Sequence, residues 1–521
     1  MEQINPPLRL TQLLDRAVQF APDAIATICG DRTRTWRESA GRISRLAHAL
    51  EALMLKRGEP VAILAQNSDR YLEFYYAVLR AGGVVDPMNN RWATPEIAFC
   101  LNDSKARILF MDDVHAPLAR DLKVAAPSLT HFVYIGDSQA PDGFLHSEDI
   151  IRDTAPGEDR CPAGEEIAAI FYTGGTTGRS KGVLLSARAI YWAQMVSQTS
   201  GVRVDGGATL YTSPMFHPSG GMSVFIGTGS VGAHIFMPKF DAGETLRLIE
   251  AHRPFAVTLA PAMLQMMLDH PDFPRRDVTG LGVIVYGMSP MPEAILQRAI
   301  KAMPHVGFLQ AYGQTETMGA VTFLKPRDHA RGLLQSCGRA TVVADIRIVD
   351  EHGHETARGE VGEVWVRTPT GMSGYLNLPK ETNEVMRDGW IRTGDAACMN
   401  EEGYIFIVDR KKDMIITGGE NVYSAEVENV LAAHPAVAAC AVIGIPDERW
   451  GERVHAIIHA RPDAHTTAEE IIRHCRTRIA GYKTPKSVEF RDEPLPLTGV
   501  GKVNKAALRA PYWRDRTRAV N

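Results

Sequence analysis

The segment from Tyr172 to Gly182 carries the strongest chemical signal in the sequence. It follows the apolar run at 167–171 and combines glycines, threonines and the two cations Arg179 and Lys181. Glycines let backbone N–H groups approach phosphate oxygens closely, and threonine and lysine add hydrogen-bond donors and positive charge. The composition therefore predicts a loop, delivered by a buried strand, that binds the triphosphate of a nucleotide.

Two other nucleotide motifs are excluded by spacing and context. A P-loop requires G-x-x-x-x-G-K-[ST], whereas Lys181 is preceded by Ser180 and followed by Gly182. Residues 227–232 read G-x-G-x-x-G, but a dinucleotide fingerprint must open a helix. The following stretch, AHIFMP, is typical of a strand, so we expect no dinucleotide site there.

The elements around the loop indicate an α/β fold. Apolar residues at helical spacing predict helices over 9–20, 36–54 and 70–83, and short apolar runs predict buried strands at 60–66 and 107–113. Such alternation favours parallel sheets. Short strands with glycine turns follow over 336–409, and a mixed tail from 410 has the length of a small domain.

The bulk composition is that of a soluble, multidomain protein. The chain has 521 residues, a formal net charge of -4 and seven scattered cysteines with no C-x-x-C. We therefore expect no nucleic-acid partner, disulfide framework or zinc site, and a cytoplasmic location. The sequence also shows no signal peptide and no apolar run long enough to span a bilayer.

Five motifs in order resemble the adenylate-forming superfamily, which includes acyl-CoA synthetases, peptide-synthetase adenylation domains and beetle luciferases. They are YTGGTTGRSKG at 172–182, YGQTE at 312–316, TGD at 393–395, DRKKD at 409–413 leading to GGEN at 418–421, and PLPLTGVGK at 494–502. The resemblance spans nearly the whole chain. One departure is Ser180, where the family usually has proline before its lysine.

The resemblance implies a fold of two domains. A large N-terminal AMP-binding domain of α/β subdomains plus a β-rich subdomain would occupy residues 1–409, and a small mobile α+β domain residues 410–521. The family hinge matches Lys412. The C-terminal domain would adenylate in one pose and then rotate for thioester formation, which is a common way to give one site two tasks.

The resemblance also assigns roles in binding ATP and Mg²⁺. Glu316 and Thr177 would hold the metal, Thr315 would contact the α-phosphate, and Lys502 would bridge the carboxylate and the α-phosphate. The phosphate loop would comprise Thr173, Gly174, Gly175, Thr176, Thr177, Gly178 and Lys181. The adenosine would lie against Gly287, Met288, Ser289, Tyr312, Gly313, Asp395 and Arg410.

Further matches point to coenzyme A as the acyl acceptor. The positions that resemble CoA contacts are Arg91, Gly418, Gly419, Glu420, Trp450, Tyr482 and Lys483. His217, in PMFHPSGG, matches a histidine that borders the acyl site in related ligases. The reaction implied is ATP-dependent formation of an acyl-adenylate with release of pyrophosphate, followed by transfer to CoA.

Two alternatives share the first half-reaction. One is a stand-alone adenylation enzyme that loads a carrier protein, and the other is a luciferase-like oxygenase. The stretch around His217 lacks the aspartate that amino-acid-activating domains place there, and the C-terminus RAVN lacks the S-K-L ending of beetle luciferases. Nothing in the sequence decides between a monomer and a homodimer.

The expected acyl pocket is apolar and contains small residues. Its predicted wall includes Gly220, Gly221, Leu259, Ala311, Met318 and Gly319, with no cation or carboxylate at its base. Such a lining favours a medium or long fatty acid, or a bulky aryl or alicyclic acid, over acetate. Gly319→Trp is the substitution that this hypothesis suggests for testing the pocket.

Overall fold

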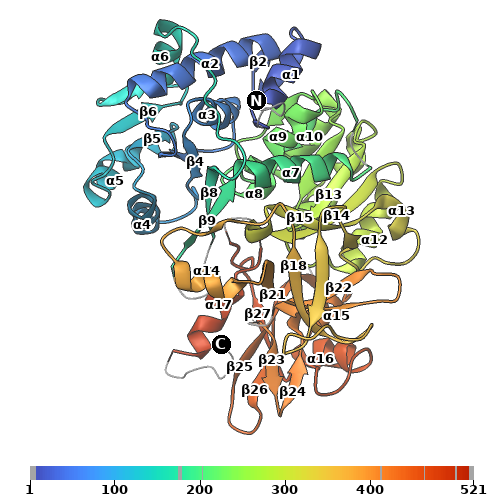
Figure 1. Ribbon diagram of the computed structural model, residues 1–521. Coiled ribbons are helices and arrows are strands. Elements are labelled where there is room, and N and C mark those ends of the chain that lie inside the picture. The colour runs from blue at the N-terminus through green and yellow to red at the C-terminus, as the bar shows by residue number, and fades with distance from the viewer. Residues whose placement is uncertain are drawn as a thin grey trace.

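The computed structural model describes residues 8–173, 179–201, 204–410, 413–462, 464–498 and 502–514. Figure 1 shows the larger N-terminal part at the top and the last strands and helices of the chain below it. The predicted α/β fold with a small C-terminal α+β domain is confirmed. The boundary near 410 and the hinge at Lys412 stay predictions, because residues 411–412 lie outside the described part.

The first sheet carries the phosphate-loop segment. Its eight strands lie in the order β19-β9-β8-β4-β3-β5-β6-β7. The strands are β3 (Pro60–Leu64), β4 (Val84–Pro87), β5 (Ile108–Met111), β6 (His131–Tyr134), β7 (Phe144–His146), β8 (Ile167–Thr173), β9 (Lys181–Ser186) and β19 (Gly374–Tyr375). Neighbours from β8 through β7 pair in parallel, whereas β9 and β19 are antiparallel to their neighbours. The apolar runs of β3 and β5 are buried, as predicted for a parallel sheet with both faces covered.

The second sheet contributes most of the predicted adenosine and acyl positions. Its nine strands lie in the order β16-β15-β14-β13-β12-β10-β11-β1-β2. They are β1 (Ile25–Cys29), β2 (Arg32–Thr35), β10 (Thr209–Tyr211), β11 (His234–Phe236), β12 (Ala256–Leu259), β13 (Val283–Gly287), β14 (Gly307–Gln314), β15 (Gly319–Leu324) and β16 (Arg339–Ala340). The G-x-G-x-x-G at 227–232 ends helix α9 (Ser223–Gly229) and leads into β11, so it does not open a helix.

Helix α3 (Asp69–Arg80) fills the space between these two sheets. Every residue from Asp69 to Leu79 is buried, and the surrounding core draws side chains from both sheets, including Val85 and Phe236. The apolar residues of α3 pack into this core, and its buried carboxylates are paired, Asp69 with Arg32 and Glu73 with Arg42. The helix therefore fixes one sheet against the other, and the phenol of Tyr75 strengthens this by donating a hydrogen bond of 2.6 Å to the Met215 carbonyl.

The remaining helices cover the sheets. In the N-terminal part they are α1 (Gln12–Phe20), α2 (Trp36–Ala52), α4 (Thr94–Ser104), α5 (Ala119–Ala125), α6 (Ser147–Asp153), α7 (Ala187–Gln198), α8 (Pro218–Gly221), α10 (Ala242–His252), α11 (Pro261–Asp269), α12 (Glu293–Ala302), α13 (Pro326–His329) and α14 (Pro379–Val385). Helix α2 begins with a complete capping box, in which Thr35 and Glu38 satisfy each other's backbone N–H groups.

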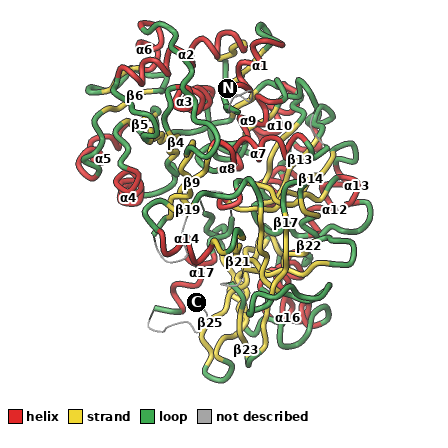
Figure 2. The backbone as a smooth tube through the Cα atoms, in the orientation of Figure 1, coloured by secondary structure: helices red, strands yellow, loops and turns green. Residues whose placement is uncertain are grey.

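A five-stranded antiparallel sheet forms the predicted β-rich subdomain. It consists of β17 (Asp345–Val349), β18 (Gly362–Arg367), β20 (Met386–Arg387), β21 (Trp390–Met399) and β22 (Ile405–Arg410). The C-terminal sheet begins a few residues later, with β23 (Ile415–Thr417), β24 (Glu420–Val422), β25 (Val437–Asp447), β26 (Gly451–Ala460) and β27 (Ser487–Arg491). Helices α15 (Ser424–Ala432), α16 (Ala468–Arg476) and α17 (Lys505–Arg509) pack on it, and Figure 2 shows this part at the bottom of the molecule.

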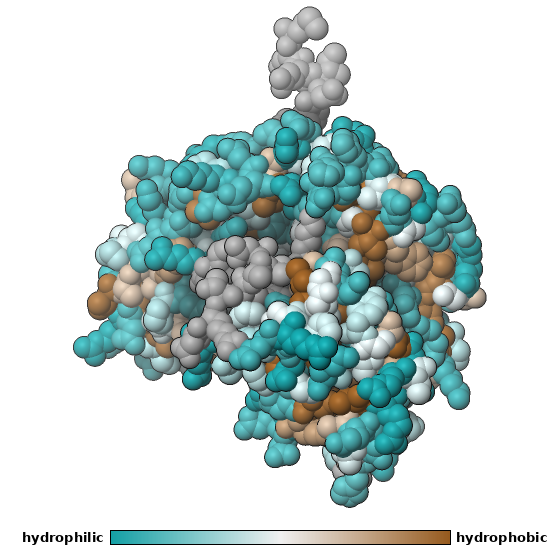
Figure 3. Space-filling model, turned by 90° about the horizontal axis from the view of Figure 1, so that it is seen from below, coloured by the Kyte–Doolittle hydropathy of each residue, from teal (hydrophilic) through white to brown (hydrophobic). Residues whose placement is uncertain are grey.

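The structure also describes the cysteines and the surface. All seven cysteines are free. In the described part of the chain, no helix is both long and apolar enough to cross a membrane. The face in Figure 3 is mostly hydrophilic, with hydrophobic residues in small separate clusters.

Candidate active site

The strands on either side of the phosphate-loop segment pair with each other. Strands β8 and β9 are antiparallel, and Thr173 lies directly opposite Lys181 at the open end. Residues directly opposite on antiparallel strands share one face, so Thr173 and Lys181 lie side by side. The predicted contacts of Gly174, Gly175, Thr176, Thr177 and Gly178 lie outside the described residues.

The YGQTE motif continues β14 towards these two strands. Thr315 and Glu316 lie in a single 3₁₀ turn, η3 (Thr315–Thr317), and Thr315 is buried. The backbone N–H of Met372 donates a hydrogen bond of 2.8 Å to the Glu316 carbonyl. Since Met372 lies just before β19, which pairs with β9, this bond brings Glu316 next to these strands.

Two of the predicted adenosine residues, Tyr312 and Arg410, meet at the buried carboxylate of a third, Asp395. The Tyr312 phenol donates a hydrogen bond of 2.8 Å to Oδ2 of Asp395, and Nε of Arg410 lies 3.1 Å from Oδ1. Asp395 on β21 and Arg410 on β22 are directly paired across the strands. The Asp395 charge raises the pKa of Arg410, so the guanidinium stays charged. A buried carboxylate with a fixed orientation can accept hydrogen bonds from a ribose.

The segment Gly287-Met288-Ser289 runs along the same edge of the sheet. Gly287 ends β13 and pairs with Ala311, the residue before Tyr312. Only glycine fits at position 313, because a Cβ there would lie 1.8 Å from the Gly319 carbonyl oxygen. The structure thus brings together the two predicted walls of the adenine site.

Lys502, in the C-terminal domain, acts electrostatically on His217 in the N-terminal domain. Burial of the imidazole, and secondarily the positive charge of Lys502, lower the pKa of His217 to about 3. The same C-terminal loop is held by Arg91, whose Nη1 donates a hydrogen bond of 3.4 Å to the Thr498 carbonyl. His217 is therefore neutral near pH 7, and its Nδ1 lies 2.9 Å from the Ser219 hydroxyl.

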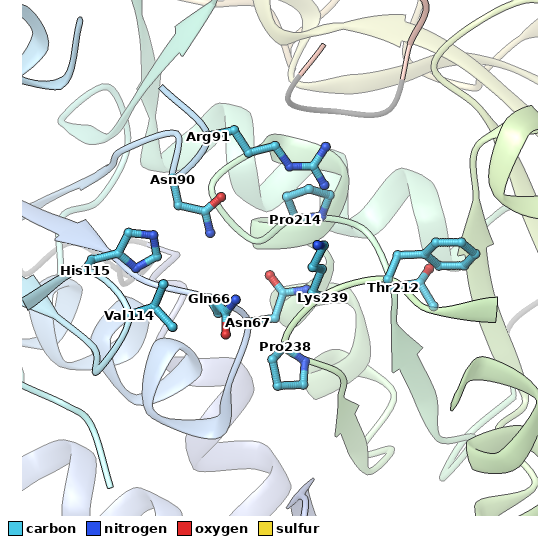
Figure 4. Close-up of a pocket in the computed structure, with 11 residues that line it drawn as sticks. Gln66, Asn67, Asn90, Arg91, Val114, His115, Thr212, Pro214, Pro238 and Lys239 are labelled. Atoms are coloured by element: carbon cyan, nitrogen blue, oxygen red, sulfur yellow. The ribbon is translucent and has the colours of Figure 1, made fainter. Parts of the chain in front are cut away.

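A polar pocket of about 190 Å³ opens next to Arg91. Its lining residues follow the carboxyl ends of strands from both sheets, the usual place for a ligand in open α/β sheets. Figure 4 shows Gln66, Asn67, Asn90, Arg91, Val114, His115, Thr212, Pro214, Pro238 and Lys239 around it. Arg91 and Lys239 supply two cations, and burial lowers the pKa of the Arg91 guanidinium. Sequence reasoning named only Arg91 of this set.

The other predicted CoA positions lie in the C-terminal domain, away from this pocket. Gly418 and Gly419 form the turn between β23 and β24, Glu420 begins β24, and the N–H of Gly418 donates to the Trp450 carbonyl at 2.8 Å. Trp450 and Tyr482 are 44% and 41% exposed, which leaves their rings open to a ligand. Lys483 forms an ion pair of 2.8 Å with Glu426. Figure 1 places β23 and β24 at the far end of the molecule from β4.

The predicted acyl positions divide among three apolar clusters. Ala311 packs with Val196 of α7 and with Val285 and Ala320, Leu259 belongs to the core beneath α11 and α12, and Met318 belongs to the core around α3. The sequence analysis did not predict Val196 as a neighbour of the acyl site. Its position among the buried residues of α7 is the feature that could have indicated it.

Gly220 and Gly221 do not leave the open space expected of them. A Cβ at Gly220 would lie 2.2 Å from the Pro214 carbonyl oxygen, and one at Gly221 would lie 2.1 Å from the Tyr75 phenol oxygen. Both glycines therefore allow close packing of the loop after His217. Gly319 has open space around it, but its φ of +95° is one that other residues adopt only with strain.

Comparisons with known proteins agree with this geometry. Residues 14–376 match the AMP-binding enzyme family, and residues 426–502 match the AMP-binding enzyme C-terminal domain. The chain is 36% identical to a fatty acid–[acyl-carrier-protein] ligase, ScoC, of Streptomyces coeruleorubidus, over 99% of both chains. It is also 36% identical to a feruloyl-CoA synthase of an Amycolatopsis species, over 95% of this chain and 98% of that one.

A solved structure extends the likeness to the whole fold. The anthranilate CoA ligase AuaEII, in complex with anthranoyl-AMP, matches with a TM-score of 0.91 and 26% identity, over 98% of both chains. The family domains, the full-length relatives and the shared fold lead to one assignment. The chain belongs to the adenylate-forming AMP-binding enzymes, in their family of ATP-dependent, AMP-forming acid–thiol ligases that act on acyl or aryl acids.

Proposed function

We propose that this protein activates an apolar carboxylic acid as its acyl-adenylate, releases pyrophosphate, and transfers the acyl group to the thiol of coenzyme A. The observation that carries the proposal is that the C-terminal loop meets the N-terminal domain, through the hydrogen bond of Arg91 to Thr498 and the effect of the Lys502 charge on His217. This arrangement supports a pose in which Lys502 serves adenylation.

The chemistry follows from the charges that meet in the site. A carboxylate must approach the negatively charged α-phosphate, and preorganised cations lower the cost of that approach. Lys181 opposes Thr173 where β8 and β9 flank the phosphate loop, and Lys502 approaches from the other domain, so two ammonium groups serve the anionic reactants. A lysine suits this task because its charge is compact. Asp395 would hold the ribose, oriented by Tyr312 and Arg410.

Glu316 fits a magnesium site shared with the nucleotide. Mg²⁺ in ATP enzymes is usually bound by one or two carboxylates plus substrate phosphates, and it neutralises charge on those phosphates. In the described ranges, no group of three or more His, Cys, Asp and Glu side chains could hold a metal, which argues against a site built from protein alone. A single carboxylate beside the strands that flank the phosphate loop is what a shared site needs. Thr177, the other proposed ligand, lies outside the described residues.

The polar pocket supports CoA as the acceptor. Arg91 and Lys239 place two cations at one pocket, and CoA carries a diphosphate and a 3′-phosphate. Rotation of the C-terminal domain about a hinge near Lys412 would withdraw Lys502 and bring Gly418 to Glu420 and Trp450 towards the N-terminal domain. The proposed boundary between residues 1–409 and 410–521 corresponds to the short connection from β22 to β23.

A medium or long fatty acid, or a bulky aryl or alicyclic acid, fits the proposed acyl site best. Ala311 on β14 packs against an apolar cluster that includes Val196 of α7, and Ala320 at the same cluster is also small. The relatives include enzymes described as acting on fatty acids and on ferulate, which support both classes.

Acid-dependent exchange of labelled pyrophosphate into ATP tests the first half-reaction without assuming an acceptor. We expect exchange with one class of apolar acid, little with acetate, and loss of exchange in Lys181→Ala. Absence of exchange with every acid from acetate to long-chain and aryl acids would overturn the proposal.

A carrier protein is the second candidate acceptor. It is favoured by one observation, the full-length similarity to an enzyme described as a fatty acid–[acyl-carrier-protein] ligase. Both acceptors present a phosphopantetheine thiol, so a comparison of free CoA with a phosphopantetheinylated carrier protein separates them.

A further inference from the structure

A single tyrosine, Tyr375, joins the proposed metal carboxylate to the phosphate-loop lysine. Its phenol donates a hydrogen bond of 2.8 Å to Oε1 of Glu316. The ammonium of Lys181 lies over its ring, 5.0 Å from the ring centroid. Glu316 and Lys181 come from different sheets, and Tyr375 from a third segment, so only the fold brings them together.

The backbone holds Tyr375 firmly in this place. Strand β19 pairs with β9, and Tyr375 lies opposite Val183, two residues from Lys181. Hydrogen bonds from the backbone N–H groups of Ser373 and Leu376 to Leu184 and Gly182 fix both sides of the residue. The N–H of Tyr375 itself donates to the Thr382 hydroxyl at 2.9 Å. The ring therefore has little freedom to follow a movement of either partner.

Tyr375 meets its two partners with different parts of one buried side chain. It is 7% exposed, its hydroxyl donates to one oxygen of Glu316, and the face of its ring attracts the Lys181 ammonium. One side chain fixes the relative positions of an anion for the metal and a cation for the phosphates.

We propose that Tyr375 is a positioning residue that sets the geometry of Glu316 and Lys181 for the magnesium complex of ATP. This role rests on the proposed adenylation function. Tyr375 contacts none of the atoms that react in adenylation. Its effect should therefore be confined to binding of metal and triphosphate and to the first half-reaction.

Tyr375→Phe separates the two contacts, because it removes the hydroxyl bond to Glu316 and keeps the ring under Lys181. A hydrogen bond to a charged group is worth about 1.5–3 kcal/mol, which corresponds to a change of about tenfold or more in an equilibrium constant. We expect the Mg²⁺ concentration for half-maximal adenylation to rise about tenfold. Tyr375→Leu should also weaken ATP binding, because it removes the ring.

Tyr404→Phe is the matched control. Tyr404 is also buried, also donates to a carboxylate (2.9 Å to Oδ1 of Asp328), and also lies under a cation, Arg339, at 4.2 Å. It contacts none of the proposed site residues named above. We expect this variant to lose stability to a similar degree and to keep the Mg²⁺ dependence of the parent.

The experiment measures three quantities for the parent and the three variants. They are the Mg²⁺ dependence of adenylation, the shift of the thermal midpoint by ATP at several Mg²⁺ concentrations, and thioester formation from supplied acyl-adenylate. The proposal expects the first two to change in Tyr375→Phe and the third to match the parent. An unchanged Mg²⁺ dependence, or an equal loss of thioester formation, would overturn it. Failure of the parent to form any acyl-adenylate would instead contradict the proposed function.

Discussion

The phenol of Tyr312 donates a hydrogen bond of 2.8 Å to the buried carboxylate of Asp395, which also pairs with Arg410. The same carboxylate is proposed to hold the ribose. Because a carboxylate has several lone pairs, the phenol can orient it and leave acceptor positions for the nucleotide.

Tyr312→Phe should therefore weaken ATP binding while the aromatic ring is kept. The loss of one hydrogen bond to a charged group predicts a rise of about tenfold in the KM for ATP. Steady-state kinetics of adenylation with varied ATP measure this. The KM for the acid serves as the internal control, and an unchanged KM for ATP would show that Tyr312 does not orient the ribose carboxylate.

Lys502→Ala should separate the two half-reactions. The charge of Lys502 acts on His217, and we propose that it serves the reaction only while the carboxylate meets the α-phosphate. We expect a loss of about 100-fold or more in acyl-adenylate formation, which corresponds to about 2.7 kcal/mol. Thioester formation from supplied acyl-adenylate should stay close to that of the parent. Equal losses in both assays would argue against two poses.

Asp86→Asn should change how stability depends on pH. Asp86 is completely buried at the end of β4, and burial raises its pKa to about 8, far above the value of 3.8 in an unfolded chain. The folded protein keeps this proton where the unfolded chain has lost it. The parent should thus lose stability as pH rises from about 4 to 8, by about 1.4 kcal/mol for each pH unit.

Thermal midpoints of Asp86→Asn and the parent between pH 5 and pH 9 test this. The thermal midpoint of the variant should rise relative to that of the parent as pH rises, because the neutral amide of the variant has no proton to lose. Asp142→Asn, at an exposed position, shows how much the thermal midpoint changes with pH when a carboxylate on the surface is removed. A difference between Asp86→Asn and the parent that stays constant across the range would contradict a raised pKa.

Ala311→Leu is a better probe of the acyl site than Gly319→Trp. A side chain at Gly319 would be strained whatever the pocket holds, because its φ is +95°. Ala311 lies in regular β14 and packs with Val196 and Ala320. The larger side chain should lower kcat/KM for the longest or bulkiest acid about tenfold or more, with a smaller effect on short acids. A uniform loss across acids would show that Ala311 does not line the site.

Much of this site could be predicted because each motif is local. The strand before the phosphate loop, the helix that ends before Gly82, and the G-x-G-x-x-G at 227–232 each depend on a few adjacent residues, and the structure agrees with these three predictions. The contacts of the phosphate loop itself stay predictions. The ordered motifs also indicated the family. Local composition and backbone conformation were enough for these features.

The parts that sequence reasoning missed depend on pairing between distant strands. Lys239 reaches the pocket of Arg91 only because β11 and β4 end at the same crevice, and Tyr375 reaches Glu316 only because β19 pairs with β9. Val196 meets Ala311 because α7 covers the second sheet. The order of strands in a sheet is set by packing of the whole core, which no local pattern encodes.

The most direct test of the central claim is to measure AMP and thioester together, from ATP, Mg²⁺ and the acid that supports exchange, with CoA or a phosphopantetheinylated carrier protein. We predict that AMP release requires both the acid and CoA, with one thioester formed for each AMP. Acid-dependent adenylate formation with no CoA thioester, and thioester on the carrier protein instead, would contradict CoA as the acceptor.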